Sequence, residues 1–332
     1  MDNQLRWGIM GCAGIARDCI MPAILESSNG RIEAIASRGP EKSRMLAEQF
    51  GVAKAYGSYE ELLEDTEVDA VYIPLPNHLH KEWTIKAAEA GKHILCEKPI
   101  ALNAWEAELM IKACSDAGVL LAEAMMYRHH PVLRRAQQLV AGGGIGDLRV
   151  IRASFTYNNP DQASNIRFKS AWGGGSLYDV GGYPLSAARF FTGKEPEAVT
   201  VNSFFSGEHD GVDMMSTGLV EFADGLTLIF DCGMWAEERR CLEIVGSEGR
   251  IEIPHAFSGK EQSGYYLFQG GELQEYRETA INAYVRQIED FGRAVFGHMP
   301  QLFLPEDAYL NMKLIDACRL SAKERRRVVL KP

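Results

Sequence analysis

Residues 5–16 read LRWGIMGCAGIA: a short apolar strand, a glycine-containing loop and the start of a helical pattern. A strand that turns directly into a helix leaves backbone N–H groups unpaired at the helix start, where they can bind a pyrophosphate. The dinucleotide-binding pattern G-x-G-x-x-G/A is met at Gly11 and Ala16, with Ala13 in place of the middle glycine. This stretch therefore predicts a dinucleotide site near the beginning of the chain.

Strand and helix patterns continue to alternate through the first 125 residues. The expected strands are residues 5–9, 31–37, 68–73, 93–96 and 119–123, with helical segments between them. Short connections of this kind favour parallel strands joined by right-handed crossovers. We therefore predict an α/β fold in which residues 1–125 form a doubly wound Rossmann domain.

The remainder of the chain has a different pattern. After a helix near 131–140, strand patterns dominate, at 147–157, 197–206, 213–223, 225–235, 240–246 and 249–253. Tight turns at 223–225 and 247–249 predict antiparallel pairing. Two helices, near 283–297 and 305–323, close the chain. We expect residues 126–304 to form a second, α+β domain with a large and mostly antiparallel sheet.

Composition excludes several classes of partner. The 332 residues include 35 Lys and Arg against 45 Asp and Glu, a net charge of −10, whereas a nucleic-acid or anionic-membrane binder carries a basic face. The basic cluster at 323–327 is expected to cap the last helix. No stretch of 18 apolar residues occurs. We predict a small-molecule substrate, no nucleic-acid partner and no membrane span.

The cysteines and histidines do not suggest a metal site. The seven cysteines include no C-x-x-C pair, and their odd number does not fit a disulfide framework. His78 and His80 have no evident third ligand, so no metal is predicted. Reduced thiols, and a beginning without the basic and apolar stretches of a signal peptide, indicate a cytoplasmic protein.

The end of the second expected strand bears on the choice of cofactor. A carboxylate there would bind the adenosine ribose of NAD, whereas an arginine accommodates the 2′-phosphate of NADP. Here the strand ends in Ser37 and Arg38, and the nearby acid, Glu33, lies in mid-strand. We therefore predict that NADP(H) is preferred, with NAD(H) as the alternative cofactor.

Three further segments carry polar groups that suggest a site. Two are loops after expected strands, 76–80 (PNHLH) and 97–99 (EKP), on the sheet edge where ligands bind. Taken alone, the 97–99 loop is somewhat more typical of a solvated turn, and the second polar loop at a strand end strengthens the functional interpretation. The third is the glycine-rich segment 172–184, in which Asp179 and Tyr183 stand four residues apart and would share one helix face. Asp179 could also act only as a helix cap.

Together these motifs resemble the glucose–fructose oxidoreductase/inositol dehydrogenase/MocA-like family. The resemblance spans nearly the whole chain and rests on residues 8–16, 76–80, 97–99, 126–128 and 174–181. It implies an N-terminal Rossmann domain and a C-terminal domain that binds substrate and forms a homodimer or homotetramer through its open sheet. It also implies that the last helix, about 305–323, packs back on the first domain.

The resemblance also implies roles for particular residues. It places Lys98 beside the nicotinamide and the reacting hydroxyl. Tyr183 stands where many members carry histidine, which indicates the tyrosine branch that includes dihydrodiol dehydrogenase, NADP-linked xylose dehydrogenase and ketosugar reductases. Hydride transfer requires proton movement at the attached oxygen, and a nearby ammonium makes a phenol more acidic. We therefore expect Tyr183 to act as acid and base, Lys98 as its electrostatic partner and Asp179 as a substrate or network anchor.

The remaining site residues are expected to bind cofactor or substrate. For the cofactor they are Gly11, Cys12, Ala13, Gly14, Ile15, Ala16, Ser37, Arg38, Pro76, Asn77, His80, Glu97 and Lys98, and for the substrate Arg128, Arg167 and Trp172. The predicted activity is hydride transfer between NADP(H) and a hydroxyl or carbonyl carbon of a sugar or related cyclic polyol or diol. Two alternatives remain: a redox-coupled, NAD-dependent glycosidase, and a non-enzymatic, cofactor-binding regulator of the same fold.

Overall fold

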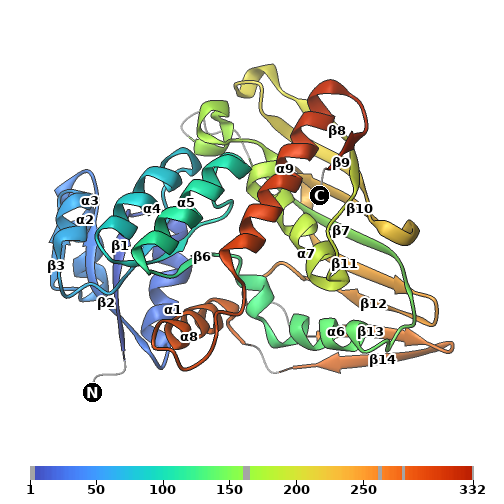
Figure 1. Cartoon of the computed structure of the whole chain (residues 1–332), viewed down its shortest axis with the longest axis horizontal. Helices are drawn as coiled ribbons and strands as arrows, with labels where there is room; N and C mark the ends of the chain where they lie inside the picture. The colour runs from blue at the N-terminus through green and yellow to red at the C-terminus, as the bar shows by residue number, and fades with distance from the viewer. Residues whose placement is uncertain (1–3, 160–164, 261–263, 279–280, 331–332) are drawn as a thin grey trace. The chain divides into compact units, whose positions relative to one another are not determined.

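The computed structural model describes residues 4–159, 165–260, 264–278 and 281–330. The chain forms two compact units, each described below by itself (Figure 1). The first unit comprises Met1–His129 and Asn282–Tyr309, and the second His130–Ile281 and Leu310–Pro332. No helix in the described ranges is both long and apolar enough to cross a membrane.

The first unit contains a six-stranded, wholly parallel sheet in the order β3-β2-β1-β4-β5-β6. Its strands are β1 (Leu5–Met10), β2 (Gly30–Ala36), β3 (Lys54–Tyr56), β4 (Ala70–Ile73), β5 (His93–Cys96) and β6 (Leu121–Glu123). The strand order reverses between β1 and β4, and such a switch point opens a crevice at the carboxyl ends of the strands. The prediction of a doubly wound Rossmann domain is confirmed.

Local sequence explains where the helices of this unit begin and end. They are α1 (Met21–Glu26), α2 (Pro40–Phe50), α3 (Tyr59–Glu64), α4 (His80–Glu89), α5 (Ala104–Ala117) and α8 (Ala283–Val295), with short turns η1 (Ala16–Ile20), η2 (Asn77–Leu79) and η3 (Met126–His129). Ser58 and Asn103 accept hydrogen bonds from the N–H groups three residues on, which caps α3 and α5. Gly118 ends α5 with a φ of 67°, a left-handed conformation that favours glycine.

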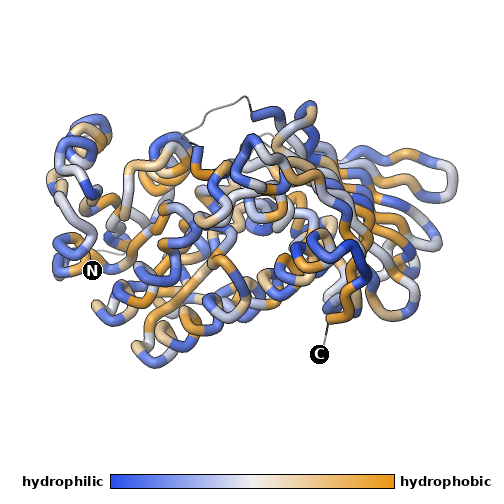
Figure 2. Tube along the Cα trace, turned by 90° about the horizontal axis from the view of Figure 1, so that it is seen from above, coloured by the Kyte–Doolittle hydropathy of each residue, from blue (hydrophilic) through white to orange (hydrophobic). Residues whose placement is uncertain are grey.

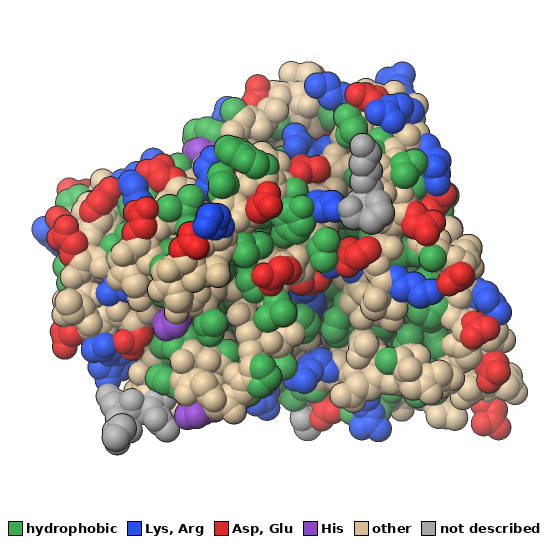
Figure 3. Space-filling view, in the orientation of Figure 1, with side chains coloured by type: hydrophobic (Ala, Val, Ile, Leu, Met, Phe, Trp, Pro, Cys, Tyr) green, Lys and Arg blue, Asp and Glu red, His purple; other side chains and the backbone are tan. Residues whose placement is uncertain are grey.

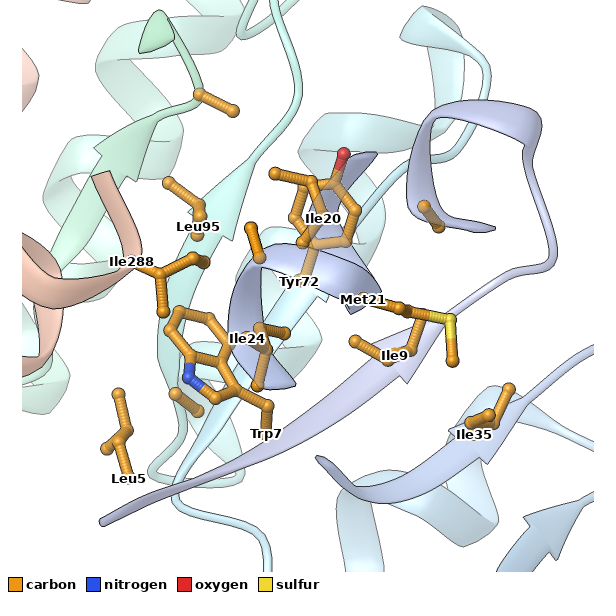
Figure 4. Close-up of a cluster of buried hydrophobic side chains, with 14 of the residues drawn as sticks. Leu5, Trp7, Ile9, Ile20, Met21, Ile24, Ile35, Tyr72, Leu95 and Ile288 are labelled. Carbon is orange, nitrogen blue, oxygen red and sulfur yellow. The ribbon is translucent and has the colours of Figure 1, made fainter. Parts of the chain in front are cut away.

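The core of the first unit includes a helix from far along the chain. Trp7 and Tyr72 of the central strands are fully buried with Ile288 of α8 (Figure 4). The Asn29 side chain donates to the Glu289 carbonyl at 2.9 Å, which fastens α8 to the turn before β2. Helix α8, from near the end of the chain, is therefore part of this unit. The last helix, about 305–323 in the sequence prediction, is divided: its residues up to Tyr309 belong to this unit and those from Leu310 to the second.

The second unit is built on a nine-stranded sheet in the order β14-β13-β12-β11-β7-β10-β9-β8-β15. Its strands are β7 (Leu148–Asn158), β8 (Ala198–Phe205), β9 (Asp213–Glu221), β10 (Thr227–Gly233), β11 (Trp235–Gly246), β12 (Gly249–Ile253), β13 (Gly264–Gln269), β14 (Glu272–Arg277) and β15 (Val328–Val329). Only β7 and β10 pair in parallel in the described sheet, so the prediction of a mostly antiparallel sheet is confirmed. Strands β13 to β15 were not predicted from the sequence.

Apolar and polar residues alternate along the strands of this sheet (Figure 2). One face of the sheet is therefore buried. The helices of this unit are α6 (Pro131–Ala141), α7 (Gly182–Thr192) and the part of α9 (Pro305–Glu324) that follows Tyr309. The other face presents one residue from each of several neighbouring strands, in the paired order Thr200, Leu219, Ile229, Arg152 and Glu243, of which the first four are exposed and Glu243 is half-buried. Figure 3 draws one side of the whole chain, and acidic and basic side chains are interspersed on it.

Candidate active site

The dinucleotide loop lies at the carboxyl end of β1, at the switch point of the first sheet. Gly11 has a φ of 125°, which only glycine adopts readily, and a Cβ there would lie 3.1 Å from the Leu75 side chain. Ala13 does not have a positive φ, so its methyl group is accommodated without backbone strain. Its carbonyl accepts from Arg17 N at 3.2 Å as the helical turn begins. Alanine in place of the middle glycine therefore causes no backbone strain in the loop predicted to bind a pyrophosphate.

The groups expected to read the adenosine end lie next to this loop. Ser37 is buried, and Arg38, the next residue, is exposed at the end of β2. The Tyr59 phenol lies within hydrogen-bonding reach of Arg38, which opposes the rise that burial causes in the pKa of Tyr59. Glu33 is occupied elsewhere, since it pairs with Lys54 at 3.0 Å. The strand end thus exposes a cation beside the buried Ser37, and a cation there suits a 2′-phosphate.

His80 has a structural role that the sequence did not predict. Its side chain is completely buried, with Nδ1 3.0 Å from the Pro99 carbonyl and Nε2 2.7 Å from the Leu75 carbonyl. Burial lowers the pKa of His80 to about 4, so the ring is neutral at pH 7 and donates to one of these carbonyls. The ring therefore joins the 76–80 loop to the 97–99 loop, and the expected cofactor contact of His80 would not come from its ring.

The Glu97-Lys98-Pro99 turn follows β5 and is fixed by hydrogen bonds to the Glu97 carboxylate. Glu97 is buried and accepts from the Tyr72 hydroxyl at 2.6 Å and from Lys98 N at 3.2 Å. Burial and the Glu97 carboxylate raise the pKa of Tyr72, so the phenol remains a donor. Lys98 is the partly exposed residue of the turn, between buried neighbours. The turn is therefore a fixed support for one ammonium group at the ligand-binding edge of the sheet.

Arg128, expected to contact substrate, is enclosed within the first unit. Only 4% of it is exposed; its guanidinium pairs with Asp307 and lies 4.4 Å over the Phe303 ring. Burial raises the pKa of the neighbouring Glu123 to about 7, and Arg128 partly opposes this rise. Arg128 thus takes part in an internal charge cluster. The sequence offered no signal for this because Asp307 lies 179 residues further on.

In the second unit, Asp179 is held by two side chains. The Tyr157 hydroxyl donates to Asp179 Oδ2 at 2.5 Å, and Arg167 Nε lies 2.9 Å from Oδ1. Burial and the adjacent carboxylate raise the pKa of Tyr157, so the phenol keeps its proton. Asp179 is therefore an oriented carboxylate, as an anchor for substrate hydroxyls requires. Sequence reasoning missed Tyr157, which comes from β7 and shows no motif of its own.

Tyr183 lies in the first turn of α7, directly after the π-helical turn η6 (Leu177–Gly181). Its ring packs at 5.0 Å from Phe155 and 5.7 Å from Phe257, and 6% of the residue is exposed. Pro184, which has no N–H to donate, is the third residue of α7 and follows directly on this change from a π-helical turn to an α-helix. The ring is thus rigidly packed, which suits a group that must present one hydroxyl accurately.

The remaining residues of the glycine-rich segment are placed by short turns. Trp172 ends the turn η5 (Ser170–Trp172) and is 40% exposed. No group of three or more His, Cys, Asp or Glu side chains within the described ranges is arranged to hold a metal ion. The candidate groups thus form two clusters, a cofactor edge with Lys98 in the first unit and Tyr157, Arg167, Asp179 and Tyr183 in the second.

Comparison with known proteins matches both units. Residues 5–125 match the oxidoreductase family with an NAD-binding Rossmann fold, and residues 133–252 match the GFO/IDH/MocA C-terminal domain. D-xylose 1-dehydrogenase (NADP(+)) 2 of Haloferax volcanii is 37% identical over 322 residues, which cover 96% of this chain and 98% of that protein.

Solved structures agree with these matches. The crystal structure of aldose-aldose oxidoreductase from Caulobacter crescentus, complexed with glycerol, has a TM-score of 0.92 and 29% identity, covering 98% of this chain and 100% of that chain. A 3-ketoreductase from Actinomadura kijaniata, solved with NADP and TDP-benzene, has a TM-score of 0.90 and 32% identity, covering 96% and 98%.

Proposed function

The chain belongs to the GFO/IDH/MocA oxidoreductase family, and on this premise we propose that it transfers hydride between NADP(H) and a hydroxyl or carbonyl carbon of a sugar or related cyclic polyol or diol. The observation that carries the proposal is a complete set of groups for this reaction. The set consists of the Gly11 loop, Arg38 at the end of β2, Lys98 and Tyr183, in a chain matched over 96% of its length by an NADP-linked xylose dehydrogenase.

The residues of the first unit fit the proposed cofactor. The positive φ of Gly11 disfavours any other residue, and a glycine without a side chain lets the loop backbone come close to a pyrophosphate. Ser37 and Arg38 would hold the 2′-phosphate through hydrogen bonds and charge. Bound NADP(H) supplies or accepts the hydride. Lys98 orients the reacting hydroxyl and stabilises negative charge that develops on its oxygen.

The residues of the second unit supply the proton and bind the substrate. Tyr183 donates a proton to the carbonyl oxygen during reduction and accepts it during oxidation. Asp179, held by Tyr157 and Arg167, accepts hydrogen bonds from neighbouring substrate hydroxyls. Arg167 and Trp172, both partly exposed, are the further side chains proposed to contact substrate.

We also propose that the protein is a cytoplasmic homodimer or homotetramer built on the exposed face of the second sheet. That face carries Phe204 stacked on Trp235 at 4.9 Å, together with Leu219 and Ile229, all more than a third exposed. Apolar groups gathered on an open sheet are typical of an interface. Cys241, the exposed one of the seven free cysteines, lies on β11 of this sheet. Its thiol should react slowly with a maleimide in the oligomer and quickly after dilution to monomer.

The test of the activity is a screen at 340 nm of aldoses, ketosugars, polyols and diols with each of the two cofactors. Net oxidation or reduction of NADP(H) with one of these classes supports the proposal. Release of an aglycone from a glycoside without net change in the cofactor would indicate the glycosidase alternative. Tight NADPH binding with no turnover on any class would indicate a regulator.

A further inference from the structure

The helical turn that begins at Leu177 is anchored by a buried carboxylate from another strand. Asp213 is the first residue of β9 and is 6% exposed. Its Oδ2 accepts hydrogen bonds from Ser176 Oγ at 2.6 Å, Leu177 N at 2.8 Å and Ser216 Oγ at 3.0 Å. A buried carboxylate with three donors is confined to one orientation, because each lost bond leaves a polar group unsatisfied. Asp213 is thus a fixed point for this turn.

The backbone before the turn passes unusually close to Asp213. Gly175 has a φ of 110°, and a Cβ there would lie 2.1 Å from Asp213 Oδ1. Glycine is required on both counts, since other residues disfavour this φ and any side chain would collide with the carboxylate. The Gly175 carbonyl in turn accepts from Asp179 N at 3.0 Å. Asp213 therefore bonds Ser176, and Gly175, the residue before Ser176, bonds the proposed anchor residue Asp179.

The carboxylate is itself fastened to the sheet. Ser216 Oγ lies 2.7 Å from Ser203 Oγ on the paired strand β8, and Ser176 Oγ lies 3.8 Å from Cys232 Sγ on β10. In the described part of the chain no cationic side chain pairs with Asp213. A buried carboxylate without a cation is costly for stability. The presence of Asp213 is better explained by the hydrogen bonds that its carboxylate accepts from Ser176 and Leu177 of the turn.

We propose that Asp213 is a positioning residue for the reaction, an inference that rests on the proposed function. By fixing residues 175–177 to three strands of the sheet, it sets where the following turn presents Asp179 and Tyr183. A displacement of about 1 Å of a reacting group can lower turnover about 100-fold. The contribution of Asp213 should therefore appear in turnover more than in cofactor binding.

The first experiment replaces the carboxylate by an amide of the same shape. Asp213→Asn removes the charge and leaves one amide oxygen to accept from Ser176, Leu177 and Ser216, so these bonds become neutral and weaker than the charge-assisted bonds of the carboxylate. We expect kcat to fall about 10- to 100-fold, while the NADPH dissociation constant, from nucleotide fluorescence, stays within about twofold. The matched control is Asp231→Asn: Asp231 also accepts from a serine, Ser154 at 2.6 Å, but lies on the neighbouring strand β10. Turnover of this control should remain near that of the unmodified enzyme.

A second comparison separates positioning from simple loss of stability. If Asp213 acts through Tyr183, then in a Tyr183→Phe background Asp213→Asn should lower turnover by less than about threefold, because coupled residues are non-additive. In the enzyme with Tyr183 intact, it should also shift the pH at which turnover is half-maximal. Equal losses of turnover in both backgrounds would overturn the proposal. So would an Asp213→Asn enzyme with an unshifted pH profile whose lower turnover is explained by a smaller fraction of folded enzyme.

Poor folding of Asp213→Asn and failure of the proposed function can each be distinguished from failure of the positioning role. Should Asp213→Asn fold poorly, Ser176→Ala removes one donor to Asp213 and should give a smaller loss of kcat with the same pH shift; a Ser176→Ala enzyme with unchanged kcat would refute the positioning role. Failure of the proposed function itself would be seen in the unmodified enzyme, as no redox turnover with any substrate class.

Discussion

Replacing Tyr183 with phenylalanine removes one hydroxyl group and leaves the ring where Phe155 and Phe257 pack it, at 5.0 and 5.7 Å. The loss to folding is limited to hydrogen bonding by that hydroxyl, about 0.5–1.5 kcal/mol. Loss of a general acid and base lowers turnover by about 10²- to 10⁴-fold, or about 3–5 kcal/mol in the transition state. The catalytic effect should therefore exceed the structural effect several-fold.

The assay measures kcat and KM at 340 nm, with the melting temperature recorded in parallel. Tyr178→Phe is a matched control, because Tyr178 belongs to the same helical segment, is 3% exposed and packs under Arg319 at 4.3 Å. It should lose as little stability as Tyr183→Phe and keep its turnover. A Tyr183→Phe enzyme with unmodified turnover would remove this residue from the mechanism. Equal losses of turnover in Tyr183→Phe and Tyr178→Phe would mean that disturbance of the helical segment, and not loss of the Tyr183 hydroxyl, lowers turnover.

Three further changes test other parts of the site. Arg38→Ala should weaken NADP(H) binding about 10- to 150-fold, by about 1.5–3 kcal/mol of charge-assisted hydrogen bonding, and change NAD(H) binding far less; titration with both nucleotides showing equal losses would exclude phosphate recognition. Lys98→Met should lower turnover at least about 100-fold with NADPH still bound, whereas near-normal turnover would reduce Lys98 to a turn residue. Because burial raises the pKa of Glu123 from 4.5 to about 7, the folded protein retains a proton there that the unfolded chain releases, so its stability falls as the pH rises through this range. Glu123→Gln should accordingly raise the melting temperature at pH 8 and change it little at pH 4.5; a uniform shift at both pH values would contradict this reasoning.

Features that depend on neighbours in the chain could be predicted from the sequence. Ser58 and Asn103 cap helices through bonds to residues three positions on. The strand–loop–helix order around Gly11 follows from apolar spacing and from one position that needs a positive φ. The tight turns at 223–225 and 247–249 likewise connect antiparallel strands, as their composition indicates. Local hydrogen bonding and backbone sterics act over a few residues, which is the range that sequence patterns report.

Features that depend on distant contacts could not be predicted in this way. Tyr157 reaches Asp179 across 22 residues, and Asp213 reaches Ser176 across 37. In the same way, the His80 ring, expected to bind cofactor, is enclosed by backbone carbonyls of two loops.

The sequence by itself determined the two-part organisation, the Rossmann topology, the motifs of the family and the candidates Lys98, Asp179 and Tyr183. Only the tertiary structure decided which polar groups support those candidates and which are enclosed, as Arg128 is by Asp307. The physical reason is that burial and hydrogen-bond partnership arise when segments far apart in the chain pack together. A residue type shows what a side chain can do, whereas its packed surroundings determine whether it is free to do it.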